Sequence, residues 1–183
     1  YMPDADAAAK AGTYLEECMK NQDSAGGVIE CRISGVPAGL GNPVFEKLDA
    51  MLSQAVMSVG AVKAVEIGDG IQVAHMKGSE DNDGFLIRDN VITKTSNHAG
   101  GIMGGISDGS EIILRAYIKP TPSISQPQPT VTSQGDPISL EIHGRHVPRA
   151  VVVVESMCAL TITDALFANM TSRLDKIQEF YSK

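Results

Sequence analysis

The sequence contains no tryptophan, and aromatic residues make up only 4% of its 183 residues. Aromatic platforms for stacking nucleic-acid bases are therefore not expected. The formal net charge of -7 also argues against nucleic acid or an anionic membrane as the main partner, while leaving room for a local basic pocket. No apolar run approaches the length of a membrane span, and no charged-then-apolar signal opens the chain. We therefore expect neither a nucleic-acid partner nor a membrane partner.

Cysteine is also scarce. Cys18, Cys31 and Cys158 are far apart, odd in number and form no CxxC pair, so neither a zinc site nor a disulfide framework is predicted. Cys31 and Cys158 lie in apolar segments that are typical of buried thiols. A reducing, cytoplasmic location fits this usage best.

Several catalytic signatures are missing as well. The chain has no HExxH, P-loop, GxSxG or paired-carboxylate pattern, so metalloprotease, nucleotide-hydrolase, serine-hydrolase and glycosidase chemistry are not supported. We expect no metal site. The sequence has four histidines, and none of them belongs to one of these catalytic motifs; they are His75, His98, His143 and His146.

What the chain does have is helical and alternating apolar patterns in mixed order, which predict an α+β fold in one domain. Residues 78–95 are polar and are expected to form a mobile loop, and the proline-rich residues 119–130 suit only an edge or a loop. We expect helices over 5–21, over 43–59 with Asn42 as N-cap, and from near Pro148 to 180. We expect strands over 27–34, 61–68, 71–78, 111–118 and 137–143.

Glycine is abundant in the stretch SNHAGGIMGGISDG, residues 96–109. Glycine permits left-handed backbone and the close approach of a ligand, so the stretch is either a tight structural turn or a ligand cradle. Residue types alone favour the turn. Similar glycine or proline joints, each beside a basic residue, occur at Gly60–Ala61, Lys119–Thr121 and Gly144–His146. Together they suit an anionic ligand, although each joint alone is more often only a turn.

Longer motifs lead to a more specific interpretation. The segments SGVPAGLGNPVFEKLDA, AVKAVEIGDG, SNHAGGIMGGISDG, KPTPSI and GRHVPRAVVVVESM, in this order, closely resemble the C-terminal half of the chorismate synthase family. The resemblance covers nearly all of residues 1–183. It implies about half of a β-α-β sandwich, with an antiparallel sheet packed on long helices, and a homotetrameric assembly.

The resemblance also implies a reaction. Members of the family convert 5-enolpyruvylshikimate 3-phosphate to chorismate by a 1,4-anti elimination of phosphate, and they need reduced FMN although no net redox change occurs. Arg145 is expected near both flavin and substrate, and His98 is expected to make a structural hydrogen bond. The flavin contacts implied by the matching motifs are Gly60, Ala61, Gly104, Lys119, Pro120, Thr121, Pro122, Ser123 and Arg145.

Three departures from the family pattern qualify this expectation. Pro122 replaces a serine, and the Asp-Pro pair expected after His146 is absent before Val147. The family's N-terminal half, which holds its two acid/base histidines, has no counterpart among the four histidines here. We therefore predict that the isolated 183-residue chain is inactive. The alternative hypothesis is a truncated, non-catalytic module that binds FMN or phosphate.

Overall fold

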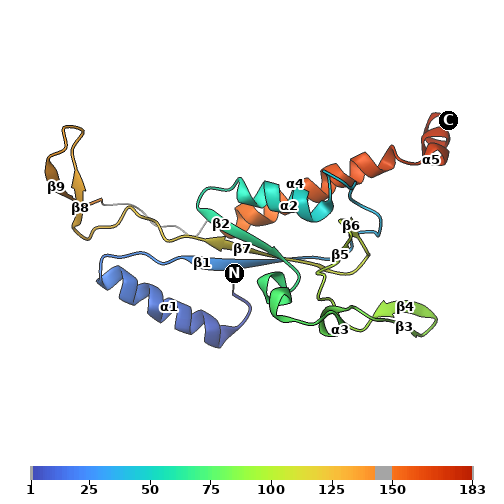
Figure 1. Ribbon diagram of the computed structural model, residues 1–183, viewed down its shortest axis with the longest axis horizontal. Helices are drawn as coiled ribbons and strands as arrows, with labels where there is room; N and C mark the ends of the chain where they lie inside the picture. The colour runs from blue at the N-terminus through green and yellow to red at the C-terminus, as the bar shows by residue number, and fades with distance from the viewer. Residues whose placement is uncertain (1, 143–149, 183) are drawn as a thin grey trace.

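The centre of the fold is a three-stranded antiparallel sheet in the order β1–β7–β2 (Figure 1). Its strands are β1 (Gly27–Ile33), β2 (Val62–Ile67) and β7 (Ile112–Ile118). The structure is a computed structural model that describes residues 2–142 and 150–182. Two helices, α2 (Leu48–Met57) and α4 (Ala150–Met170), pack on each other and on the sheet. The observed fold is α+β with an antiparallel sheet on helices, as the sequence predicted.

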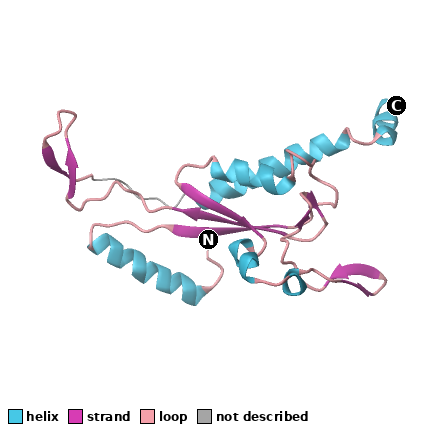
Figure 2. Cartoon of the chain, in the orientation of Figure 1, coloured by secondary structure: helices cyan, strands magenta, loops and turns pink. Residues whose placement is uncertain are grey.

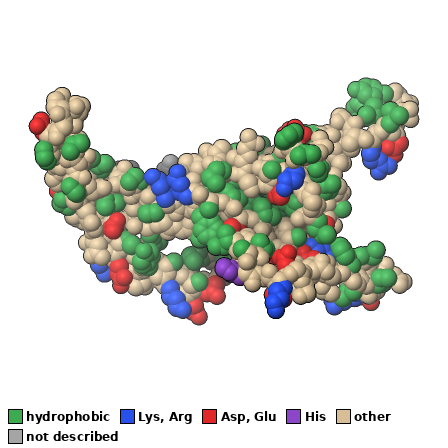
Figure 3. All heavy atoms as spheres, viewed as in Figure 1, with side chains coloured by type: hydrophobic (Ala, Val, Ile, Leu, Met, Phe, Trp, Pro, Cys, Tyr) green, Lys and Arg blue, Asp and Glu red, His purple; other side chains and the backbone are tan. Residues whose placement is uncertain are grey.

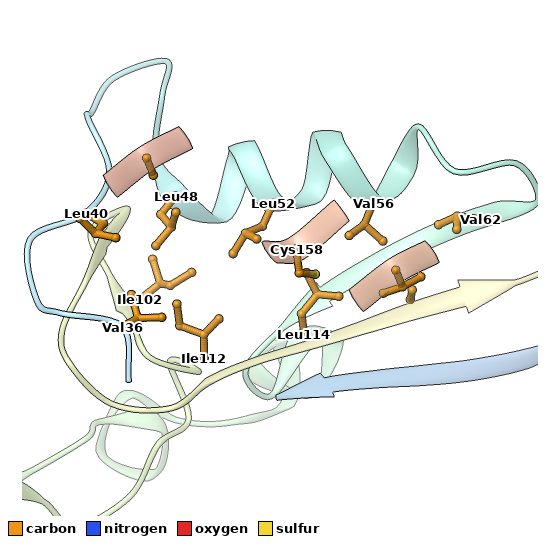
Figure 4. Close-up of a cluster of buried hydrophobic side chains, with 13 residues drawn as sticks. Val36, Leu40, Leu48, Leu52, Val56, Val62, Ile102, Ile112, Leu114 and Cys158 are labelled. Atoms are coloured by element: carbon orange, nitrogen blue, oxygen red, sulfur yellow. The ribbon is translucent and has the colours of Figure 1, made fainter. Parts of the chain in front are cut away.

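Alternation along β7 explains which face of the sheet is covered. Ile112, Leu114 and Ala116 are fully buried, whereas the residues between them are only half-buried. Figure 4 shows Ile112 and Leu114 directed toward the side chains of α2 and α4. The opposite face is polar: the Arg115 Nε donates to Glu30 at 2.9 Å. The buried apolar core comprises Val36, Leu40, Leu48, Leu52, Val56, Val62, Ile102, Ile112, Leu114, Ala116, Val154, Cys158 and Ala165.

Of the remaining elements, helix α1 (Ala5–Lys20) lies across the sheet from α2 and α4 (Figure 2). Helix α1 is capped by Asp4, whose carboxylate accepts from the Ala7 N–H at 2.7 Å, and none of its residues is buried. The shorter elements are η1 (Gly70–His75), α3 (Gly78–Asp81), β3 (Phe85–Arg88), β4 (Val91–Lys94), β5 (Ile102–Met103), β6 (Ile106–Ser107), β8 (Gln128–Val131), β9 (Pro137–Leu140) and α5 (Leu174–Tyr181). The β8–β9 hairpin and α5 project from opposite ends of the molecule.

The expected start of the second helix was wrong. Asn42 does not cap a helix; its backbone exchanges hydrogen bonds of 2.8 and 3.0 Å with that of Glu46. The helix begins only at Leu48, and Phe45 is 92% exposed instead of lying on the apolar face. Gly41 explains the delay, because its positive φ of +115° holds the chain against the Gly105 carbonyl and Leu48.

The strand expected over 71–78 was also wrong. Gly68 and Gly70 have positive φ, but Asp69 between them is right-handed with a φ of -74°, so the turn lacks the two consecutive left-handed residues of a tight hairpin and the chain leaves the sheet after β2. Local hydrogen bonds, Gln72 N–H to Asp69 and Met76 N–H to Val73, then form the 3₁₀ helix η1.

The segment 78–95 is not a structureless loop. It holds the short helix α3 and the paired strands β3 and β4. Asp89 and Asn90 join these strands with φ of +52° and +60°, values that suit the two-residue turn of a right-twisted hairpin. The expected mobility of the segment stays a prediction.

The C-terminal helix is shorter than expected. α4 ends at Met170, and a turn over 171–173 separates it from α5. The expected start, Pro148, lies outside the described residues. The strand expected over 137–143 forms only over Pro137–Leu140, since residues 141 and 142 lie outside any strand; residue 143 is outside the described residues. Within the proline-rich segment, Pro129 lies in β8 of an isolated two-stranded sheet, in keeping with the expected edge position.

Candidate functional site

Two of the predicted flavin segments meet at one end of the central sheet. The Lys119 N–H donates to the Ala61 carbonyl at 2.9 Å, directly after the pairing of Val62 with Ile118. Ala61 has a φ of +72°, a left-handed conformation that costs an alanine about 1–2 kcal/mol. Gly60 beside it is exposed and has open space where a side chain would project. The Gly60–Ala61 turn therefore exposes backbone next to Lys119, and Ala61 in this turn has a strained, left-handed conformation.

Residues 24–26, which precede β1, hold the segment 119–123 in place. The Ser24 hydroxyl donates to the Thr121 carbonyl at 2.6 Å, and Gly26 packs so closely that a Cβ there would lie 2.6 Å from the Ile118 carbonyl. The Pro122 carbonyl accepts from the Gln128 side-chain amide at 3.2 Å. Residues 119–122 remain exposed and Ser123 is half-buried. The segment is therefore both anchored and accessible.

The glycine-rich stretch 96–109 uses its glycines in two ways. A Cβ on Gly100 would lie 2.4 Å from the Gly68 nitrogen, and one on Gly101 would lie 2.6 Å from the Glu111 carbonyl. These two glycines allow backbone to pack on backbone. Gly104 differs: it is exposed in the turn between β5 and β6, has a φ of +60°, and meets nothing within 4 Å. Among the four paired glycines of the stretch, Gly104 is the one with open space where a Cβ would project.

Among the described residues, the structure does not bring Gly104 together with the predicted flavin contacts at 60–61 and 119–123. The Leu48 N–H, at the start of α2, donates to the Gly105 carbonyl at 2.8 Å, whereas Gly60 follows the far end of this helix. A helix of this length, Leu48–Met57, spans about 15 Å. Gly104 and the joint at Lys119 therefore lie at opposite ends of α2.

A buried cluster of charges lies beside the glycine-rich stretch. The Lys94 ammonium is 2.8 Å from Asp108 and 3.1 Å from Asp83, and the exposed fractions of these side chains are only 8%, 11% and 3%. Burial opposes ionisation of Asp83, but bonds from Ser96, Ala99, His98 and Lys94 together hold its pKa well below its usual range. The Asp108 pKa is lowered for similar reasons. Burial opposes charge on Lys94 too, yet the two carboxylates raise its pKa.

His98 lies beside this charged cluster and makes the expected structural hydrogen bond. Its Nδ1 is 2.6 Å from the Asp69 carboxylate, and the Asp69 N–H donates to the His98 carbonyl at 2.9 Å. The hydrogen bond to Asp69 raises the pKa of the imidazole. His98 thus ties the glycine-rich stretch to the turn that follows β2.

Sequence reasoning missed the roles of Asp83 and Lys94, because it assigned both to a loop. The apolar runs FLIR and VITK on either side of Asp89–Asn90 are a hairpin signal that was available in the sequence. Arg145, His143 and His146 lie outside the described residues, as does the position of the gap after His146.

Two cysteines lie between the sheet and helix α4. Cys158 is buried and Cys31 half-buried; contact between the two thiols raises the pKa of Cys158 and lowers that of Cys31. No cluster of three or more His, Cys, Asp or Glu residues that could hold a metal occurs in 2–142 or 150–182. The expectation that no apolar run approaches the length of a membrane span was wrong: by length and composition alone α4 could cross a membrane, with 22% of its most apolar window buried.

The fold agrees with that of a solved protein. A structure described as a crystal structure of chorismate synthase superposes with a TM-score of 0.75 at 29% identity, covering 98% of this chain and 48% of that one. The chain therefore shares the α+β architecture of that enzyme. A family profile described as chorismate synthase matches residues 1–167. The chain belongs to the chorismate synthase family.

Curated relatives agree. Chorismate synthase of Lachnoclostridium phytofermentans is 58% identical over 187 residues, and that of Agathobacter rectalis is 56% identical over 187 residues. In both cases the match covers 100% of this chain and 51% of the relative. The chain thus spans about half the length of the curated relatives that it matches.

Proposed function

We propose that the protein functions as a chorismate synthase, a lyase of the shikimate pathway. The proposed reaction is the 1,4-anti elimination of phosphate from 5-enolpyruvylshikimate 3-phosphate, in which a C–H and a C–O bond break and a new C=C bond forms. Identity of 56–58% to relatives of that name across the whole chain is the observation that supports it. These matches do not favour the alternative of a truncated binding module.

We further propose that reduced FMN is the cofactor. The described residues offer two separate places that suit contact with a flavin. The joint Gly60–Ala61 offers exposed backbone beside an exposed lysine, and at the opposite end of α2 Gly104 has open space where a Cβ would project. When bound, reduced FMN supplies electron density as phosphate leaves and recovers it afterwards, so that no net redox change results. We propose Arg145 as a further contact of flavin and substrate.

The residues of this chain would act by binding and orientation. The Lys119 ammonium offers a positive charge to an anionic group, and the anchored backbone of segment 119–123 holds the base of this side chain beside Ala61. Proton transfer is assigned to no histidine described here, because the family's acid/base histidines correspond to none of them. The isolated chain is accordingly predicted to be inactive. A cytoplasmic homotetramer is the proposed form of the working enzyme.

Lys119→Gln in the full-length protein tests the site. Loss of a charge-assisted contact worth about 1.5–3 kcal/mol should weaken FMN binding about tenfold or more. Lys10→Gln is the matched control, because Lys10 is an exposed lysine on α1. FMN titration followed by flavin fluorescence, together with chorismate formation from the phosphorylated substrate, gives the readouts. Equal FMN affinity in both variants would remove Lys119 from the site, and absence of chorismate formation by the wild type would refute the function.

A further inference from the structure

We propose that Lys94 is a positioning residue: with Asp83 and Asp108 it fixes both ends of the glycine-rich stretch 96–109 and so sets the place of the Gly104 turn. This inference rests on the proposed function, in which Gly104 lies against flavin. Lys94 is the last residue of strand β4, in the hairpin that Figure 1 shows projecting from the sheet. The ammonium that links Asp83 and Asp108, which we call the Lys94 clamp, therefore comes from a neighbouring element.

Asp83 holds the first end. Its carboxylate accepts from the Ser96 hydroxyl at 2.7 Å, the His98 N–H at 2.8 Å and the Ala99 N–H at 3.0 Å. Three donors within four consecutive residues thus converge on one side chain. The Lys94 ammonium, 3.1 Å away, balances the charge that these neutral donors leave.

Asp108 holds the second end. Its carboxylate accepts from Lys94 at 2.8 Å and from the Ser110 N–H at 2.8 Å, while its own N–H donates to the Gly101 carbonyl at 3.0 Å. Lys94 also donates to the Asn97 side chain at 3.3 Å, whose oxygen accepts from the Gly101 N–H at 2.9 Å. A single ammonium therefore links residues before and after the Gly104 turn.

The contacts of Lys94 exclude a direct role with a ligand. An ammonium has three donors, and Asp83, Asp108 and Asn97 provide three acceptors for them. With only 8% of its side chain exposed, Lys94 has neither a donor nor a surface to offer to phosphate or flavin. Lys94 therefore acts through the backbone that it holds.

Burial makes this clamp sensitive to any loss of charge. One ammonium faces two buried carboxylates, so removal of Lys94 leaves two negative charges in a site almost closed to water. A buried ion pair contributes little net stability compared with apolar packing. Apolar side chains, however, could not accept hydrogen bonds from the N–H groups of His98 and Ala99. The main effect of the charged cluster is therefore to hold the backbone of the stretch in place.

Lys94→Met in the full-length protein tests the proposal, with Val154→Ala as control for general destabilisation because Val154 is buried in α4. We expect FMN affinity to fall about tenfold, the size typical of residues that orient a binding group from behind, and to stay unchanged in the control. Amide hydrogen exchange without flavin should be faster at Ala99 and Gly101 in Lys94→Met only. Unchanged exchange and unchanged affinity in a folded Lys94→Met variant would overturn the proposal.

A second variant guards against failure to fold. Asp108→Ala leaves Lys94 and Asp83 as a pair with no net charge, so the variant should still fold. The C-terminal end of the stretch 96–109 would then lose its ion pair with Lys94. The same loss of affinity is expected, together with faster exchange at Ser110, whose N–H donates to the Asp108 carboxylate at 2.8 Å, and normal values would again overturn the proposal. Failure of the proposed function is distinguished by the wild type: if it binds no FMN, the flavin assignment falls, while exchange at Ala99 and Gly101 still decides whether Lys94 positions the stretch.

Discussion

The two glycine pairs of the stretch 96–109 look alike in sequence but differ in structure. Gly100 and Gly101 are buried against the backbone of Gly68 and Glu111, where no side chain fits. Gly104 is exposed and has open space around it, while its neighbour Gly105 is buried, and a Cβ there would lie 2.6 Å from the Lys47 Cβ. The sequence posed a choice between a structural turn and a ligand cradle. The structure shows that the first pair packs as a turn, while Gly104 alone has the room that a cradle requires.

The largest expected effect is at the first pair. Gly100→Ala places a Cβ 2.4 Å from the Gly68 nitrogen in a left-handed conformation. The combined strain and overpacking should lower the free energy of unfolding by about 2–5 kcal/mol, measured by urea denaturation. Gly12→Ala is the control, because Gly12 lies in α1 with open space around it and alanine should stabilise that helix by up to about 1 kcal/mol. A loss of less than about 1 kcal/mol for Gly100→Ala would erase the distinction between the pairs.

A smaller effect on stability is expected at Gly104. Gly104→Ala meets no atoms, so only the left-handed conformation penalises it, by about 1–2 kcal/mol. FMN affinity should fall by more than this stability loss explains, since the added methyl group occupies the space proposed for flavin. Urea denaturation and FMN titration of the same variant measure the two quantities. Unaltered FMN binding would reduce Gly104 to a second structural glycine.

The smallest effect concerns His98, which joins the first pair to the turn after β2. Its pKa is raised in the folded state by the hydrogen bond to Asp69, so its stabilising contribution is fully present below the unfolded pKa of about 6.5. That contribution is lost as the pH rises through the higher folded value. Urea midpoints measured from pH 6 to 9 should therefore decline slightly in the wild type. The His98→Asn variant should lack this part of the decline, and an identical profile would dissociate His98 from the effect.

The sequence predicted the parts of the fold whose signal is local. The alternation of apolar residues in β1, β2 and β7, and the helical composition of α1, placed these elements within one or two residues of their observed bounds. Errors arose where contacts distant in sequence decide the backbone. Gly41 packs on Gly105 and delays α2, and no pattern within 43–47 records that contact. The joint at Ala61 and Lys119 was predicted only through the resemblance, and the clamp of Lys94 joins residues from three segments.

Helix α4 shows a further consequence of how this chain distributes its apolar residues. Its buried side, which includes Val154 and Cys158, packs on the core, but Leu160 and Phe167 on its outer side are 65% and 62% exposed. With Met51 and Ala55 of α2 they line an open groove of about 690 Å³. Figure 3 shows more apolar side chains at the surface, and those of Ile87 and Ile92 in the β3–β4 hairpin are over 70% exposed. In colloidal terms the chain alone is an amphiphile, and salts such as sulfate that strengthen apolar burial should promote its self-association.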